Sequence, residues 1–213
     1  MNIELIKRVI SSIILIPFSL FFITKGSLIL NFFLIIVLLL SVSEWNKMTN
    51  NINLKILGFL FLILSFYSIY SLRNNIDGGL IYIYFVLLIC ISTDIGGFVF
   101  GKIFKGPKLT SISPNKTYAG MIGSYIFTLT LLTLFINFFE ADFFNNEMVY
   151  LYFLIILIST ISQLGDLTLS YFKRKSKIKD TGNIIPGHGG VLDRIDGMIF
   201  AFPYAFLLTK FVL

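Results

Sequence analysis

Cysteine and charged residues are scarce in this chain of 213 residues. Cys90 is the only cysteine, so an internal disulfide is impossible and a disulfide-stapled fold is excluded. Only 13% of the residues are charged and 56% are hydrophobic, and the mean hydropathy is +0.89. Soluble domains carry about 25% charged residues. The composition therefore excludes an ordinary soluble domain and predicts that the chain lies in lipid.

Short segments of alternating polar and apolar residues, which are typical of membrane β-barrels, are also missing. Long apolar runs occur instead, and their backbone amides can be satisfied in hydrocarbon only by helices. We predict an all-α, polytopic transmembrane protein with about seven spans, within a range of roughly five to nine. Several spans are shorter than the roughly 20 residues of a full crossing, so some could be re-entrant. The expected segments are Val9–Ile23, Leu28–Ser43, Leu54–Leu72, Leu80–Thr93, Ala119–Phe139, Val149–Leu164 and Met198–Leu213.

The distribution of charge predicts the orientation of the spans. If the N-terminus is cytoplasmic, Lys25, Arg73 and Lys210 are the only three of the 17 basic residues on the outer side, which leaves 14 inside (17 − 3). This asymmetry follows the positive-inside rule. The segment Phe139–Met148 has three acidic residues and no basic one, as expected for an outer loop. A cleavable signal peptide is not expected, because the first apolar run contains Pro17 and lacks a small-residue cleavage site.

We expect one integral membrane domain over residues 1–213. Spans occupy 1–79, and a catalytic region follows at about 80–213, with cytoplasmic loops at 94–118 and 165–197. The net charge of +6 is concentrated on this side, where it would meet anionic lipid head groups and a nucleotide rather than nucleic acid.

Three carboxylates in the second loop suggest a metal site. Asp166 follows the sixth span, and Asp193 and Asp196 are spaced to lie on one helix face. Oxygen ligands select Mg²⁺ or a similar hard ion, and two such ions can support phosphoryl or nucleotidyl transfer. In the alternative interpretation, Asp193 caps the last helix and Asp196 pairs with Arg194.

Basic residues and glycines between these carboxylates suggest a phosphate cradle. Lys173, Arg174 and Lys179 precede the sequence Pro186-Gly187-His188-Gly189-Gly190, whose glycines allow close approach of the backbone to an anion. We expect His188 to bind phosphate or to assist proton transfer. Lys175 and Lys177 are more simply explained as contacts to lipid.

The first loop contains polar residues suited to a nucleotide. Asp94 ends a span, and residues 113–117 form a turn with hydroxyls, an amide and one ammonium. Residues 96–103 only approximate a P-loop, because Ile103 replaces the metal-binding hydroxyl. Glu44-Trp45, at the end of the second span, could be an interfacial anchor pair.

Together these motifs closely resemble the phosphatidate cytidylyltransferases, or CDP-diacylglycerol synthases. The resemblance covers about residues 92–197, and the N-terminal spans match only in character, including Glu44-Trp45. The matching signature consists of Ser170, Lys173-Arg174, Lys179-Asp180, His188-Gly189-Gly190 and Asp193-Arg194-x-Asp196. Upstream elements are also similar: Asp94-x-Gly96-Gly97, Gly101-Lys102, Ser113-Pro114-Asn115-Lys116-Thr117 and Gln163-x-Gly165-Asp166.

The chain departs from the family pattern in two places. The family usually has Trp-Glu-Gly where this chain has Tyr118-Ala119-Gly120, so one expected carboxylate is missing. The chain is also shorter than typical members, with the difference before Leu80.

The resemblance implies condensation of CTP with phosphatidic acid to give CDP-diacylglycerol and pyrophosphate, a step of phospholipid biosynthesis. It implies direct attack of the lipid phosphate on the α-phosphorus of CTP, without a covalent enzyme intermediate. Mg²⁺, as one or two ions with or without a monovalent cation, would be held by Asp166, Asp193 and Asp196, with Asp94 as a weaker ligand. The implied catalytic residues are Asp166, Asp193, Asp196, Lys173, Arg174 and His188. The implied substrate-binding residues are Ser113, Asn115, Lys116, Thr117, Lys179, Asp180, Gly189, Gly190 and Arg194.

Family analogy further implies a homodimer that binds CTP, phosphatidic acid and membrane lipid. Abundant Ile, Asn, Phe and Lys suggest an AT-rich genome and a bacterial inner membrane, with the active site on the cytoplasmic face. Two alternatives remain: an ion-coupled transporter with Asp94 and Asp166 as ion ligands, or another CDP-lipid transferase.

Overall fold

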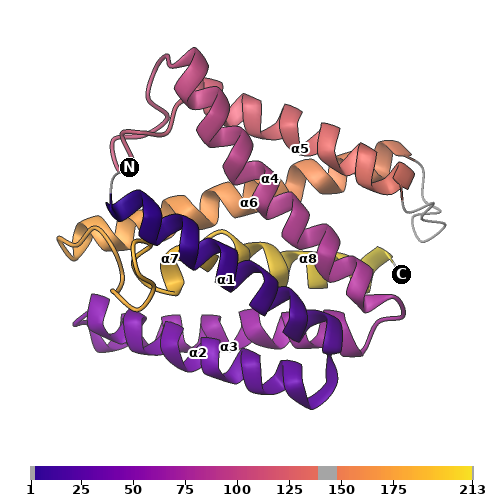
Figure 1. Ribbon diagram of the computed structural model, residues 1–213, viewed down its shortest axis with the longest axis horizontal. Helices are drawn as coiled ribbons and strands as arrows, with labels where there is room; N and C mark the ends of the chain where they lie inside the picture. Colours follow the sequence, from indigo (N-terminus) through magenta and orange to yellow (C-terminus); the bar gives the residue numbers. More distant parts are fainter. Residues whose placement is uncertain (1–2, 139–147, 213) are drawn as a thin grey trace. The chain divides into compact units, whose positions relative to one another are not determined.

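The computed structural model describes residues 3–138 and 148–212, and within these ranges the chain is helical and forms no β-strand (Figure 1). Every predicted span corresponds to a helix, which confirms the all-α fold class. Helices α2 to α6 are long and apolar enough to cross a membrane, and α1 and α8 contain the shorter apolar stretches Ile13–Lys25 and Met198–Thr209. The helices are α1 Ile3–Lys25, α2 Ser27–Met48, α3 Ile52–Asn74, α4 Gly79–Phe104, α5 Tyr118–Phe138, α6 Met148–Lys175, α7 Leu192–Ile195 and α8 Met198–Val212.

Two helices continue beyond the predicted ends of their spans. Helix α4 reaches Phe104 and α6 reaches Lys175, so Asp94 and Asp166 lie within helices rather than in loops. The apolar run marks where lipid ends, whereas a helix ends where its backbone turns. After α6 that turn is a Schellman motif: Lys177 is left-handed (φ 57°), and the amide of Ile178 donates to the carbonyl of Lys173 at 3.0 Å. The predicted acidic outer segment falls mostly in residues 139–147, outside the described residues.

The burial pattern is that of a membrane protein. Large apolar side chains such as Leu28, Leu57 and Phe98 are exposed along the helices, whereas hydroxyls such as those of Ser41 and Ser159 are buried. Apolar surface on this scale is unfavourable in water but suits contact with lipid, and small polar residues are typical of membrane helix interfaces. The protein is therefore an integral membrane protein.

The first of two compact units comprises Met1–Leu80 and Phe172–Asp196. Here α2 and α3 run side by side (Figure 1). The indole of Trp45 donates to the carbonyl of Leu54 at 2.9 Å and lies against Gly58, where a Cβ atom would overlap the ring. Because Trp45 and Glu44 are both buried, their side chains do not face lipid, which contradicts the alternative of an interfacial anchor pair. The tail of α6, the following loop and α7 thus fold with the N-terminal helices.

The second unit comprises Ile81–Tyr171 and Gly197–Leu213. Helices α4 and α5 approach closely through glycines, and a Cβ atom at Gly123 would overlap the Phe100 ring. A buried hydroxyl cluster links three helices: Thr93 of α4 lies 3.2 Å from Thr128 of α5 and 2.8 Å from Ser159 of α6, measured between side-chain oxygens. Small residues at this interface therefore serve helix packing.

Candidate active site

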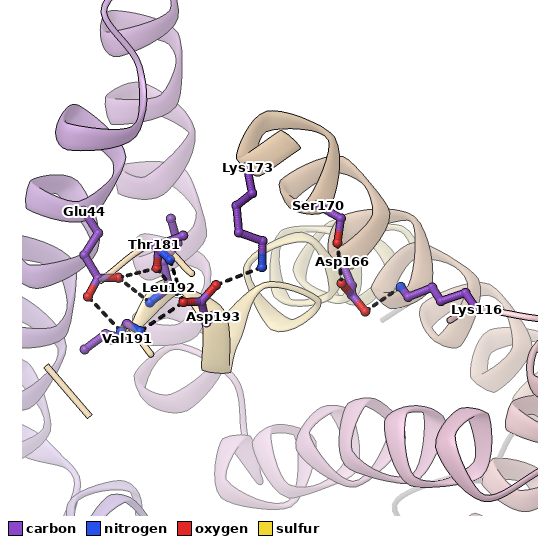
Figure 2. Close-up of polar contacts among 10 residues, drawn as sticks. Glu44, Lys116, Asp166, Ser170, Lys173, Thr181, Val191, Leu192 and Asp193 are labelled. Atoms are coloured by element: carbon purple, nitrogen blue, oxygen red, sulfur yellow. Dashed lines mark hydrogen bonds and ion pairs between the residues drawn. The ribbon is translucent and has the colours of Figure 1, made fainter. Parts of the chain in front are cut away.

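The centre of the first unit's site is the carboxylate of Asp193, in the short helix α7 (Figure 2). Its Oδ1 atom accepts a hydrogen bond from the Lys173 ammonium at 2.8 Å. Its Oδ2 atom accepts from the amide of Thr181 at 2.7 Å, the amide of Gly190 at 3.0 Å and the hydroxyl of Thr181 at 3.0 Å. The side chain of Asp193 is only 4% exposed, so these bonds replace nearly all of its contact with water.

Burial alone would raise the pKa of Asp193 by disfavouring the charged form. The hydrogen bonds from Lys173, Gly190 and Thr181, together with the charge of Lys173, outweigh burial and place the pKa below its ordinary value. Asp193 is therefore ionised at neutral pH. The alternative in which it merely caps the last helix is wrong, because Asp193 lies inside α7 and its bonds go to residues 173, 181 and 190.

The loop between α6 and α7, residues 176–191, is called the signature loop below. It contains a tight turn over Ile185-Pro186-Gly187-His188, closed by the His188 amide and the Ile185 carbonyl at 3.0 Å. Proline at the second position and glycine with positive φ (76°) at the third are typical of a type II turn. The amide of Ile185 then donates to the carbonyl of Gly189 at 2.9 Å, so this turn presents His188 on an ordered backbone.

Helix α1 contributes a contact to His188. The hydroxyl of Ser11 donates to the carbonyl of Pro186 at 3.1 Å and lies 2.7 Å from Nδ1 of His188. The Ser11 hydroxyl has only one proton, and it donates this proton to the Pro186 carbonyl, which can only accept. The hydroxyl oxygen is then an acceptor for His188, so this arrangement favours a proton on Nδ1. Nε2 is then the basic nitrogen of the neutral ring, as proton transfer requires.

Glu44 of α2 is a buried residue of this site that the sequence-based site set does not contain. It is 1% exposed, and it contacts both ends of the signature loop region (Figure 2). Its Oε1 atom accepts from the Val191 amide at 2.9 Å, and its Oε2 atom accepts from the Leu192 amide at 2.8 Å and the Thr181 hydroxyl at 2.9 Å. The sequence marks Glu44 only as a polar residue at the end of an apolar run. A polar residue in that position is equally typical of a side chain at a lipid interface.

In the second unit, Asp166 of α6 pairs with Lys116, which precedes α5 (Figure 2). Lys116 Nζ and Asp166 Oδ2 are 2.5 Å apart, and the hydroxyl of Ser170 donates to Asp166 Oδ1 at 3.3 Å. Both side chains are about a quarter exposed, at 27% for Lys116 and 26% for Asp166. A lysine and a carboxylate from the two predicted loops are thus brought together beside open solvent.

The turn that carries Lys116 is ordered by its own backbone. The amide of Lys116 donates to the Ser113 carbonyl at 3.0 Å, and the amide of Leu109 donates to the Lys116 carbonyl at 2.8 Å. The Thr117 hydroxyl accepts from the Gly120 amide at 3.1 Å and caps the first turn of α5. Thr117, predicted to bind substrate, therefore has a structural role in this unit.

The remaining predicted residues are divided between the units. Asp94 is exposed on α4, and Asn115 is exposed in the turn before α5. In the first unit Asp196 is half-buried after α7, and Gly189 has a left-handed backbone with φ 86°. The exposed charged residues of that unit's site are Arg174, Lys179, Asp180 and Arg194.

Among residues 3–138 and 148–212, no group of three or more His, Cys, Asp or Glu side chains is close enough to form a metal site. Asp166 belongs to one unit, and Asp193 and Asp196 belong to the other. The donor chemistry nevertheless fits Mg²⁺, because Oδ1 of Asp193 accepts one hydrogen bond, from Lys173, and keeps a lone pair. The predicted metal set therefore stays a prediction.

Known proteins resemble this chain over most of its length. A model described as the cytidylyltransferase family matches residues 50–212. The chain is 34% identical over 212 residues to a phosphatidate cytidylyltransferase of Rickettsia bellii, covering 97% of this chain and 91% of that protein. It is 36% identical to the Rickettsia prowazekii enzyme of the same name, over 96% of this chain and 92% of that protein.

A Bacillus subtilis phosphatidate cytidylyltransferase is 37% identical over 153 residues, which cover 71% of this chain and 56% of that protein. The chain belongs to the cytidylyltransferase family. The resemblance inferred from the motifs is thereby confirmed.

Proposed function

We propose that this protein is a phosphatidate cytidylyltransferase that converts CTP and phosphatidic acid to CDP-diacylglycerol and pyrophosphate. The observation that carries the proposal is the ordered signature loop, whose Gly190 amide donates to Asp193, and the ion pair of Asp193 with Lys173, which joins the two helices that flank the loop. Relatives of this name cover nearly the whole chain, including these residues.

The reaction joins two anions. A phosphate oxygen of phosphatidic acid attacks the α-phosphorus of CTP, and the bond to the departing pyrophosphate breaks. Mg²⁺ would neutralise and orient the phosphates, with Asp166, Asp193 and Asp196 as its proposed ligands and Asp94 as a weaker one. Whether one ion or two bind, and whether a monovalent cation accompanies them, is open to direct measurement.

The chain's own basic residues would bind and orient the phosphates. Lys116 and Lys173 are each directed by a carboxylate, which orders a flexible side chain before substrate binds. Arg174, Lys179 and Arg194 are exposed and available to anions. His188, whose Nδ1 lies 2.7 Å from the Ser11 hydroxyl, would bind phosphate or assist proton transfer. No side-chain nucleophile is required, because the lipid phosphate attacks directly.

The membrane location suits a lipid substrate, because the acyl chains can stay in the bilayer while CTP arrives from water. We propose that the site faces the cytoplasm of a bacterial inner membrane, since the basic residues gather on that predicted side. Cysteine labelling at Lys177 and Lys25 with a membrane-impermeant reagent tests this orientation. Family analogy favours a homodimer, which cross-linking of purified protein would test.

Transfer of radiolabel from CTP to lipid is the decisive experiment. Membranes containing the protein should form lipid-soluble label only with phosphatidic acid and Mg²⁺, and excess EDTA should abolish it. Label that forms without added phosphatidic acid in lipid-depleted samples would indicate a different acceptor. Folded protein that forms none under any condition would reject the proposal, and a transporter would then be the first alternative.

A further inference from the structure

We infer that Glu44 is a positioning residue for the signature loop, and that its carboxylate sets the geometry of Asp193. The inference rests on the proposed function, because it assigns a role in that reaction. Glu44 lies before residue 50, where the family match begins, and its partner Val191 is 147 positions away in the sequence. The structure alone connects it to the site.

The contacts of Glu44 join Thr181, within the signature loop, to the end of the loop and the start of α7. Thr181 donates its hydroxyl to Oε2, while the amides of Val191 and Leu192 donate to Oε1 and Oε2. A single carboxylate therefore closes the segment 181–191 into a loop. Without it, two peptide N–H groups and a buried hydroxyl would lose their acceptor, which is unfavourable at a site shielded from water.

The glycines of the loop fit this carboxylate closely. A Cβ atom at Gly190 would overlap both the Glu44 carboxylate and the Thr181 hydroxyl, and a Cβ atom at Gly182 would lie 2.8 Å from Glu44 Oε1. The second glycine of His188-Gly189-Gly190 is therefore required by a side chain of α2. This gives the motif a steric reason that is separate from any contact with phosphate.

Glu44 reaches Asp193 through Thr181. The hydroxyl of Thr181 lies 2.9 Å from Glu44 Oε2 and 3.0 Å from Asp193 Oδ2, and its one proton is shared between the two carboxylates. The amide of Thr181 also donates to Asp193 at 2.7 Å. A shift of Thr181 therefore moves two of the four donors that orient Asp193.

The hydrogen bonds of Glu44 are those of a residue that holds the loop in place, and not of one that binds metal or substrate. Both of its oxygens accept from uncharged N–H and O–H groups, and no basic residue in the described part of the chain forms an ion pair with it. By contrast, Asp193 is paired with Lys173, a candidate phosphate-binding group. Glu44 would thus act on the reaction only by holding residues that touch substrate or metal.

The test compares Glu44→Gln, Glu44→Asp and a matched control, Ser43→Ala, which changes an exposed neighbour on the same helix. In Glu44→Gln, the new side-chain amide would place its own hydrogens against the donors of the loop. We expect kcat per folded molecule to fall by about 10- to 100-fold, and the Mg²⁺ concentration for half-maximal activity to rise. Glu44→Asp keeps the charge and should recover part of the activity, and Ser43→Ala should match the original enzyme.

A purely structural role would lower the yield of folded protein but leave kcat per folded molecule and the Mg²⁺ dependence unchanged, and that result would overturn the inference. If Glu44→Gln is not recovered folded, Thr181→Val and Thr181→Ser decide the question. Valine removes the shared hydroxyl at similar volume, and serine keeps it. A fall of about tenfold or more for valine alone supports the inference, whereas equal activities overturn it.

The two proposals fail in different ways. An original enzyme that makes no labelled lipid rejects the proposed function. An active original enzyme whose Glu44→Gln variant is equally active rejects only the positioning role.

Discussion

The two loops that carry the signature residues differ in how they are ordered. The signature loop, residues 176–191, is held by the buried carboxylates of Glu44 and Asp193, which accept hydrogen bonds from six donor groups, with the Thr181 hydroxyl shared between them. The segment 105–117 is held by backbone turns, and its Lys116 pairs with a partly exposed carboxylate, Asp166. In the signature loop, buried charged groups hold the backbone in place. In the segment 105–117, the charged pair is partly exposed and the backbone is held without it.

Because of this difference, substitutions of the two aspartates should have distinguishable effects on stability. Removing a buried, paired charge leaves its partner uncompensated, whereas a solvent-accessible pair contributes little to stability. Asp193 should therefore matter for folding and activity, and Asp166 mainly for activity.

Replacement of each aspartate by asparagine breaks the comparison most directly. We expect Asp193→Asn and Asp166→Asn each to lower CTP turnover by at least about 100-fold, because each removes a charge proposed to act on the phosphates. Only Asp193→Asn should also destabilise the protein, by about 3 kcal/mol. For Asp166→Asn, which changes a side chain that is 26% exposed, the loss should stay below about 1 kcal/mol. Thermal unfolding in detergent and the lipid-label assay measure the two effects, and equal destabilisation would contradict the contrast.

Acid should weaken the signature loop through the lowered pKa of Asp193. A carboxyl whose folded pKa is depressed contributes stability above its unfolded pKa, about 3.9, and loses it as the pH falls through the folded pKa. The difference in unfolding temperature between the original protein and Asp193→Asn should therefore stay constant from pH 7 to about pH 4 and shrink below that. A difference that already shrinks near pH 6 would require another titrating group.

Thr117 tests whether the segment before α5 depends on its helix cap. Thr117→Ala should cost about 1 kcal/mol of stability, because the Gly120 amide loses its acceptor. Thr117→Ser keeps the hydroxyl and should remain near the original stability. If alanine and serine lower turnover equally without any change in unfolding, Thr117 acts through its methyl group or on substrate, and not as a cap.

Lys177 provides the smallest expected effect. Its left-handed backbone, φ 57°, follows α6 at a position where glycine is favoured. Lys177→Gly should raise stability by up to about 1 kcal/mol and leave turnover unchanged. The same change at Lys175, within α6, should instead lower stability by about 1 kcal/mol. If glycine raised the stability at both positions, the left-handed backbone of Lys177 could not be the reason for the gain.

The sequence predicts functional residues from motifs whose members lie close together in the chain. It predicts functional roles for Lys173 and Asp193, which stay predictions, and the structure shows that the two side chains form an ion pair. The partners of the site from distant helices were not predicted: Ser11 and Glu44 have no local pattern that distinguishes them from other polar residues near a membrane surface. The role of Thr117 as a helix cap is also not evident from the sequence, because a hydroxyl that caps a helix looks the same there as one that binds a ligand.

The all-α membrane fold, the seven apolar segments and the cytidylyltransferase signature can be read from the sequence without a structure. Hydropathy and motif spacing are local quantities, and they suffice because lipid demands helices wherever apolar residues continue. Three features are known only from the three-dimensional structure: α4 and α6 extend past the apolar runs, the signature loop folds with the N-terminal helices, and Gly190 makes room for Glu44. The last two depend on side chains that meet across more than a hundred residues, and no pattern within one helix specifies that meeting.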